Sequence, residues 1–149
     1  MAIRFYTPKY TVFNNFSAHA TEFEGILYPT SEHAYQAAKC TNPAGKSAIQ
    51  QARSPREAKK LANVTYASDR DPKWDEKKVS VMESILRTKL EQHAEAREAL
   101  DETKNEDIVE DSPVDYFWGE GADGTGKNML GKLWMKIRDD PQPNSSSSS

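Results

Sequence analysis

Apolar residues recur at helical spacing in two stretches, and this periodicity constrains the fold more than any other feature of the sequence. Lys and Glu fill the face opposite the apolar residues in the first stretch, Pro72 to Gln92, whose apolar positions are Val81, Met82, Ile85, Leu86 and Leu90. The second stretch, near Lys127 to Arg138, carries on one face Met129, Leu130, Leu133, Trp134 and Ile137. Both patterns predict amphipathic helices that pack on a core.

Shorter elements are expected around these two helices. They are extended runs at 3–6 and 25–28, a helix over 32–39 ended by 42–45, a helix from Ser54, a helix over 94–100 and a strand candidate at 108–109. At Ser54 the next residues, Pro55 and Glu57, supply a first-turn proline and a capping box. The sum predicts a helix-rich α+β fold with a few short strands.

The length and composition bound the organisation and the location. A chain of 149 residues fits one domain, expected over 1–140, and its aromatic residues suit a globular core. Residues 141–149 end in five serines and are expected to form a disordered tail. No signal sequence or membrane-spanning run is visible, so a cytoplasmic protein without membrane contact is expected.

Charge and cysteine content exclude further classes. A net charge of −3 argues against a broad basic surface for nucleic acid, although not against a small basic pocket. The single Cys40 excludes an internal disulfide and a cysteine-based zinc cluster. Neither a metal nor a cofactor is expected.

A glycine-rich loop at 119–127 matches two nucleotide-binding patterns and fits neither. It spells G-x-G-x-x-G and G-x-x-x-x-G-K, but Asn128 stands where a P-loop needs Ser or Thr, and no further βαβ unit follows. Glycine amides before a helix could still contact an anion, so Asn128 and 124–126 are candidates for ribose or phosphate contact. A plain glycine-rich turn explains the loop equally well.

The segment Pro29-Thr-Ser-Glu-His-Ala-Tyr-Gln-Ala-Ala-Lys39 is the most informative in the chain. On a helix Glu32, Gln36 and Lys39 share one face, which Tyr35 borders. The helix dipole should keep Glu32 ionised, and desolvation would lower the pKa of Lys39. The alternative is a solvated stripe, and His33 could equally be a core residue.

This segment resembles the signature of the NADAR family, whose YbiA-like members are N-glycosidases. Further similar motifs occur in the same order, over about residues 5–138. They include Phe5-Tyr6, Asn15-Phe-Ser17, Phe23-Glu-Gly25, Ser54-Pro through Ala58, Trp74, Val81-Met82, Lys89 to His93, Val109-Glu110, Asp115-Tyr-Phe-Trp-Gly119 and Gly126 to Gly131. Several motifs in one order are more specific than any single one.

The resemblance implies hydrolysis of a bond between ribose C1 and an exocyclic base amine. The expected substrate is a phosphorylated ribosylaminopyrimidine of the riboflavin pathway. One alternative is removal of ADP-ribose from guanine in DNA or RNA, and another is a non-catalytic ADP-ribose-binding module. Catalysis would fall to Glu32, Lys39 and Asp115. Substrate contacts would fall to Asn15, Phe16, Ser17, His33, Tyr35, Gln36, Trp118, Gly119, Gly126 and Asn128.

Two mechanisms suit these residues. In direct displacement, Glu32 orients or deprotonates water, with Asp115 as a second carboxylate. In ring opening, the neutral amine of Lys39 attacks an imine and holds the sugar as a Schiff base. We expect Glu32 and Lys39 to be essential in either case, and slightly favour the second route.

The remaining assignments are less specific. Phe16 and Trp118 could sandwich the base, although core packing is the commoner role of an aromatic residue. Trp74 and Trp134 are expected in the core. Supplementary candidates are Arg4 and Lys127 for phosphate, and Glu110 or Asp111 as residues that cap or end an element.

Overall fold

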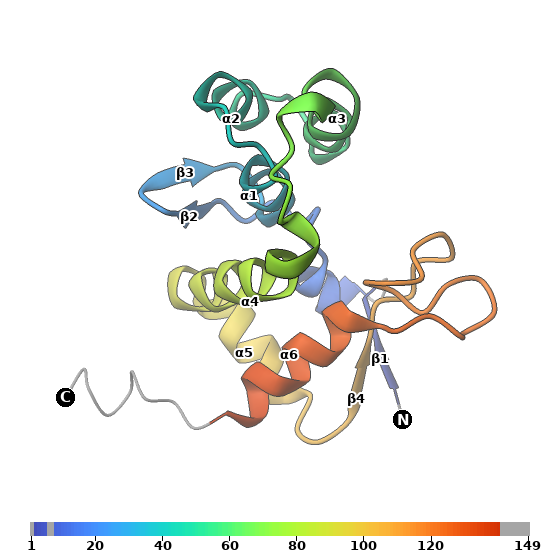
Figure 1. Cartoon of the computed structure of the whole chain (residues 1–149). Helices are drawn as coiled ribbons and strands as arrows, with labels where there is room; N and C mark the ends of the chain where they lie inside the picture. Colours follow the sequence, from blue (N-terminus) through green and yellow to red (C-terminus); the bar gives the residue numbers. More distant parts are fainter. Residues whose placement is uncertain (1, 6–7, 141–149) are drawn as a thin grey trace.

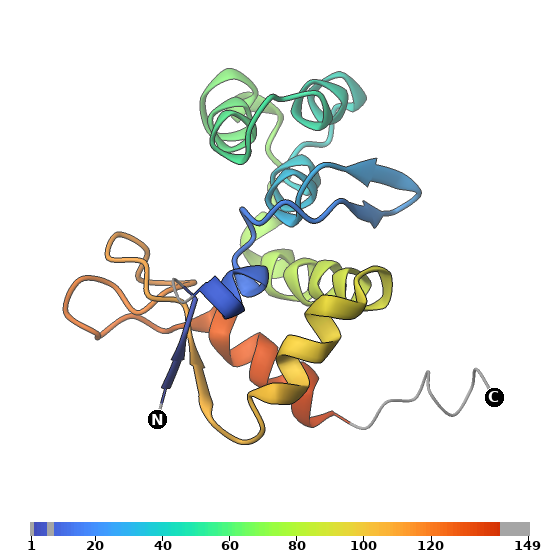
Figure 2. The ribbon, with the colours of Figure 1, turned by 180° about the vertical axis from the view of Figure 1, so that it is seen from behind.

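Helix α4 (Trp74–Gln92) runs through the middle of the molecule (Figure 1). This computed structural model describes residues 2–5 and 8–140, so the expected tail at 141–149 lies outside the described residues. On one side of α4 lie α1 (Ser31–Ala38), α2 (Pro43–Gln50), α3 (Pro55–Lys60) and the β2–β3 hairpin; on the other lie α5 (Ala94–Glu102), α6 (Met129–Asp139) and the β1–β4 pair (Figure 2). The predicted helix-rich α+β fold is confirmed.

The strands form two small pairs. β1 (Ala2–Arg4) runs parallel to β4 (Asp107–Val109), as predicted for the extended segments there. β2 (Thr21–Phe23) and β3 (Ile26–Tyr28) form an antiparallel hairpin. Its two-residue turn has positive φ at both positions, 52° at Glu24 and 82° at Gly25, which matches the twist of paired strands. Between β1 and β2, however, Pro8–Phe13 form a 3-10 helix, η1, that the sequence did not predict.

The segment after α1 continues into a helix that was not predicted. Residues 42–45 were expected only to end α1. Instead the side chain of Asn42 accepts a hydrogen bond from the backbone N–H of Ala44 (2.9 Å), and Pro43 is the first residue of α2. Asn and Pro are common both after one helix and at the start of the next, so the end of α1 was predicted correctly and the start of α2 was missed.

Helix α3 begins at the predicted capping signal. The hydroxyl of Ser54 accepts a hydrogen bond from the N–H of Glu57 (3.0 Å), and the Glu57 carboxylate accepts one from the N–H of Arg53 (2.7 Å). Ala58 is buried where α3 packs on α1. The chain then passes through a π-helix, η2 (Leu61–Thr65), and a 3-10 turn, η3 (Ala67–Asp69), before α4.

The core contains both tryptophans assigned to it. Trp74 and Trp134 are buried, and Trp134 Nε1 donates a hydrogen bond to the carbonyl of Phe13 (3.0 Å). The rings of Phe13 and Trp134 lie 5.1 Å apart between centroids, a distance typical of favourable aromatic pairs. Within 2–5 and 8–140, no helix has both the length and the apolar character that crossing a membrane requires.

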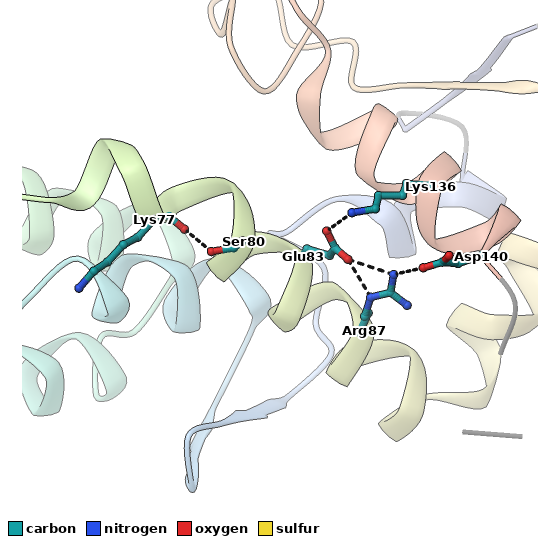
Figure 3. Close-up of polar contacts among 6 residues, drawn as sticks. All are labelled: Lys77, Ser80, Glu83, Arg87, Lys136 and Asp140. Carbon is teal, nitrogen blue, oxygen red and sulfur yellow. Dashed lines mark hydrogen bonds and ion pairs between the residues drawn. The ribbon is translucent and has the colours of Figure 1, made fainter. Parts of the chain in front are cut away.

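An ion-pair network joins α4 to the end of α6 (Figure 3). The Glu83 carboxylate accepts hydrogen bonds from Lys136 (2.9 Å) and Arg87 (3.0 Å), and Arg87 also contacts Asp140 (2.5 Å). Exposed pairs of this kind contribute only about 0–1 kcal/mol each. The network therefore adds little to a contact that the core already stabilises.

A long loop, 110–128, connects β4 to α6 and projects from the body (Figure 1). Its glycine amides donate to carbonyls of the loop itself, Gly121 to Ser112 (3.1 Å) and Gly126 to Glu120 (2.7 Å). The first amides of α6 also donate to loop carbonyls: Met129 to Phe117 (2.9 Å) and Leu130 to Trp118 (3.1 Å). These donors are already used, so the structure corrects the expectation of an anion site at 124–126 and at the start of α6.

Candidate active site

One cavity brings the helix α1 stripe together with the long loop. Its volume is about 590 Å³, within the range of small-molecule sites. It lies among α1, α3, α4, the start of α6, the 110–118 part of the loop and the segment after η1. Its lining is Asn14, Asn15, Phe16, Glu32, Tyr35, Gln36, Lys39, Arg56, Lys59, Met82, Glu110, Asp111, Ser112, Pro113, Val114, Asp115, Trp118 and Leu130.

The floor of the cavity is the predicted stripe of α1. Glu32, Gln36 and Lys39 all line it, and Glu32 and Lys39 are only 7% and 8% exposed. Thr30 caps the helix by accepting a hydrogen bond from the N–H of His33 (3.1 Å). The carbonyl of Asn15 accepts from the N–H of Glu32 (3.0 Å), which ties the start of α1 to the neighbouring segment. A solvated surface stripe is therefore excluded.

Burial changes the expected protonation of Glu32. The helix dipole was expected to keep this carboxyl ionised, but desolvation raises its pKa above the ordinary value. A hydrogen bond from Gln36 Nε2 to Glu32 Oε2 (2.6 Å) and the charges of Lys59 and Lys39 oppose the rise, while Asp115 adds to it. The dipole contributes only about 1 kcal/mol or less at exposed termini, which is small beside the cost of burying a carboxylate.

Lys39 behaves as the sequence predicted for a desolvated amine. Burial lowers its pKa to about 8, against the opposing charge of Glu32. Its Nζ donates a hydrogen bond to Asn63 Oδ1 (3.1 Å) in η2 and lies 5.3 Å from the centre of the Tyr35 ring. At pH 7 such a group is neutral in about a tenth of molecules, enough to act as a nucleophile.

The buried oxygen of Gln36 is a further feature of this floor. Its Nε2 is used by Glu32, whereas Oε1 has no hydrogen-bond partner within the part of the chain that the structure describes. Buried polar atoms without partners are uncommon in native proteins and call for an explanation. Among the described residues, the oxygen therefore stays an unsatisfied buried acceptor beside the cavity.

The opposite wall comes from the long loop. Asp115 lines the cavity, and its Oδ1 accepts hydrogen bonds from the N–H groups of Phe117 (3.0 Å) and Trp118 (2.8 Å). These bonds hold the Trp118 ring edge-on to Tyr35, with centroids 5.6 Å apart. Asp115 therefore shapes this wall, in addition to placing negative charge near Glu32.

Phe16 and Trp118 both line the cavity, and Phe16 is 42% exposed. An aromatic side chain left this accessible is available to a flat ligand, whereas Trp118 also packs against the core. Base stacking between them stays a prediction.

Five other predicted site residues do not reach the cavity. His33 is buried, with its ring nitrogens near Thr30 Oγ1 (2.8 Å) and the carbonyl of Ala52 (3.0 Å). Ser17 Oγ contacts His19 Nδ1 and Lys89 Nζ, each at 2.8 Å. These contacts are internal, so the structure favours a structural role for both residues.

The other three residues shape the long loop and the start of α6. Asn128 adopts a left-handed backbone (φ 51°), accepts from the N–H of Glu110 (2.9 Å) and donates to the carbonyl of Ile108 (3.0 Å). A Cβ at Gly126 would lie 2.4 Å from the carbonyl oxygen of Gly119, and one at Gly119 would lie 3.0 Å from that of Glu110. Close backbone packing thus requires both glycines.

The predicted phosphate cations are also engaged elsewhere. Arg4 forms an ion pair with Glu120, and Lys127 Nζ lies 5.7 Å from the centre of the Phe117 ring. The cations that do line the cavity, besides Lys39, are Arg56 and Lys59 on α3. Sequence reasoning missed them, although their spacing of three residues after a clear helix start places them on one face.

Glu110 is the other lining residue whose role was underestimated. It was considered only as a capping or terminating residue. Burial, together with the nearby charges of Asp111 and Asp115, raises its pKa to about 7. It therefore gives the cavity a carboxyl that takes up a proton near neutral pH.

Comparisons with known proteins agree with this site. The model of the NADAR domain family matches residues 4–140. N-glycosidase YbiA of Escherichia coli is 37% identical over 139 residues, covering 92% of this chain and 86% of the relative. An N-glycosidase of Nostoc punctiforme is 37% identical, covering 94% and 92%. The chloroplastic riboflavin biosynthesis protein PYRR of Zea mays is 32% identical, covering 85% of this chain and 22% of the relative.

The same relationship holds in three dimensions. The NMR structure of E. coli YbiA superposes with a TM-score of 0.84 at 36% identity, covering 93% of this chain and 83% of that one. With curated N-glycosidases this similar over most of its length, the chain is an N-glycosyl hydrolase. It belongs to the NADAR family.

Proposed function

We propose that this N-glycosidase hydrolyses the bond between ribose C1 and the exocyclic amine of a phosphorylated ribosylaminopyrimidine, an intermediate of riboflavin synthesis. The observation that carries the proposal is the convergence of Glu32 and Lys39 in one cavity of nucleotide-like size. The similarity to a riboflavin biosynthesis protein supports the pyrimidine substrate. The exposed ring of Phe16 supports a flat base in the cavity.

The first step is opening of the sugar ring. Glu32, whose pKa is raised by burial, gives its proton to the ring oxygen while the lone pair of the exocyclic nitrogen forms a C1=N bond. The C1–O bond breaks, the ring oxygen becomes a hydroxyl, and C1 becomes an electrophilic iminium carbon. A carboxylate is left beside the positive charge that develops there.

The amine of Lys39 then adds to C1. Its lone pair forms the new C–N bond, and a proton passes from this nitrogen to the exocyclic nitrogen, with Glu32 as the carrier. The base amine leaves with its bonding pair, so the sugar remains attached to Lys39 as a Schiff base. Water adds to C1, Lys39 departs, and the sugar closes again, which restores both groups.

Trapping with borohydride tests this route. During turnover of the ribosylaminopyrimidine phosphate, the reductant should fix the sugar on Lys39, giving the mass of one reduced sugar phosphate on the peptide that contains it. The Lys39→Met variant should show no adduct. Lys60 is an exposed lysine at the end of α3, so the Lys60→Met variant should be trapped like the wild type. Product formation without any lysine-linked sugar would contradict the Schiff-base route and favour direct attack by water.

A second substrate class uses the same bond. ADP-ribose attached to the exocyclic amine of guanine also joins ribose C1 to a base nitrogen, and a single-stranded or flipped base needs few protein contacts. Parallel turnover assays should use the ribosylaminopyrimidine phosphate and a short oligonucleotide with ADP-ribosylated guanine. We expect the higher kcat/KM for the pyrimidine. A higher value for the oligonucleotide would overturn the metabolic assignment while leaving the N-glycosidase chemistry intact.

A further inference from the structure

We infer that Arg56 and Lys59 form the phosphate-binding subsite of the cavity, in place of the glycine loop. The inference deepens the proposed function and rests on it for the identity of the substrate. Both side chains line the cavity and are exposed to incoming ligands. They lie three residues apart on α3, so they share one face of that helix.

The charge balance of the cavity makes these two cations necessary for an anionic substrate. Four carboxyl groups line it, those of Glu32, Glu110, Asp111 and Asp115, and a phosphate would be repelled by any that are ionised. Lys39 is needed as a neutral nucleophile for part of the cycle. Arg56 and Lys59 are then the remaining cations along the described lining.

The charge of Lys59 acts on both reactive groups. Its charge lowers the pKa of Glu32 and also that of Lys39, so its ammonium lies within electrostatic reach of both. In the Schiff-base route ribose C1 must sit between Glu32 and Lys39. A sugar phosphate bound there can therefore reach Lys59 with its phosphate group.

The helix that carries the two cations is well anchored. Ser54 and Glu57 cap its start, and Ala58 is buried against α1 between the two cationic positions. An Arg and a Lys presented from a fixed backbone can form charge-assisted hydrogen bonds to phosphate oxygens. The amides at 124–126 do not offer comparable free donors, because they donate hydrogen bonds within their own loop.

The test compares a phosphorylated substrate with its dephosphorylated nucleoside. Wild type should prefer the phosphorylated compound in kcat/KM. Arg56→Ala and Lys59→Ala should each reduce this preference by roughly 10-fold, and the double variant should abolish most of it. Lys60→Ala, which removes an exposed lysine of the same helix that does not line the cavity, is the matched control and should keep the full preference.

The outcomes separate this subsite from the other roles of Lys59. An equal loss on both substrates would mean that Lys59 acts only on Glu32 and Lys39, and would overturn its assignment to phosphate. A preference that survives in the double variant would overturn the subsite itself. The preference should also fall with added salt, as expected for exposed charges.

Ligand binding without turnover tests the phosphate subsite separately from the proposed substrate. Titrations with ribose 5-phosphate and with ribose, followed by NMR or calorimetry, should show tighter binding of the phosphate, and this difference should disappear in the double variant. If the wild type binds both alike, the subsite is refuted. If it prefers the phosphate yet turns over neither substrate, the proposed substrate fails while the subsite stands.

Discussion

Two buried lysines, Lys39 and Lys89, look alike in their titration and differ in their surroundings. Burial lowers the pKa of Lys39 to about 8 and that of Lys89 to about 7. Lys39 lines the cavity and donates to the side chain of Asn63. Lys89 is 0% exposed and its Nζ donates to the carbonyl of Asn14 (3.3 Å) and to Ser17 Oγ (2.8 Å).

The difference shows that a lowered pKa does not by itself mark a catalytic amine. Perturbed groups gather at functional sites, but structural networks perturb pKa values too. Access to a cavity beside a second reactive group distinguishes Lys39. Lys89 instead supports the segment that presents Asn14, Asn15 and Phe16 to the cavity, and it acts on the site only through that segment.

Replacement of each lysine by methionine should separate the two roles most strongly. Lys39→Met should reduce kcat/KM by about 10³-fold or more, because the nucleophile is lost. Lys89→Met should stay within about 10-fold of wild type, because it alters only the support of the cavity wall. Steady-state kinetics with folding checked by circular dichroism would measure both. Comparable losses in two folded variants would contradict the distinction.

Glu32→Gln should have the next largest effect. The amide keeps the shape of the side chain and removes the transferable proton, so a loss of roughly 10²- to 10⁴-fold in kcat is expected. Glu110→Gln is the matched control within the same cavity, and we expect it to lose less, because the proposed steps do not use it. A larger loss for Glu110→Gln would move the proton-transfer role to the other wall. Single-turnover rates would distinguish chemistry from product release.

The pH dependence should reveal that Glu32 and Lys39 work as a pair. The active pair carries one proton, whichever group holds it in the resting state. In wild type kcat/KM should therefore fall as pH rises through about 8, where Lys39 titrates, and fall again below the raised pKa of Glu32. Each pH unit beyond either pKa should lower kcat/KM by about 10-fold.

In Glu32→Gln the alkaline limb should reverse. Of the two reactive groups only the Lys39 amine then titrates, so residual activity should rise with pH as Lys39 becomes neutral. The midpoint should lie below that of wild type, because the Glu32 charge that raises the Lys39 pKa has gone. Residual activity that still falls with pH would indicate a cationic Lys39 and the direct attack of water. Lys89→Met should retain the wild-type profile.

Much of the site could be predicted from local spacing and from the family resemblance. The stripe of Glu32, Gln36 and Lys39 follows from helical geometry. Burial could not be predicted from spacing, so the dipole was given too much weight at Glu32. The free donors of the glycine loop were also misjudged, since their use depends on contacts within the loop.

Lys89 was hidden by a pattern that otherwise predicted α4 correctly. It was grouped with the polar face, yet it lies three and four residues after Leu86 and Ile85, on the buried side. Its position among the apolar residues of an amphipathic helix was the one indication in the sequence that Lys89 is buried. Its partners come from the segment after η1, which contains no periodic pattern, so they could not have been identified from sequence.

Burial of Lys89 should also make folding stability depend on pH. In the unfolded chain Lys89 has its ordinary pKa of 10.5, and in the folded protein about 7. Between these values the unfolded state binds more protons, so this group makes the free energy of unfolding rise with pH across the window from about 7 to 10.5. Below about pH 7 its penalty is complete and no longer changes.

Lys89→Met lacks this contribution, while Lys39 has the same sign in both proteins and cancels in the difference. The unfolding free energy of wild type minus that of the variant should therefore increase with pH, by on the order of a few kcal/mol across the whole window. Urea unfolding at pH of about 7, 8 and 9 would measure the start of this rise. Lys60→Met, which removes an exposed lysine, should give a flat difference. A flat difference for Lys89→Met as well would mean that Lys89 stays fully charged when folded, and the two buried lysines would then differ in protonation as well as in access.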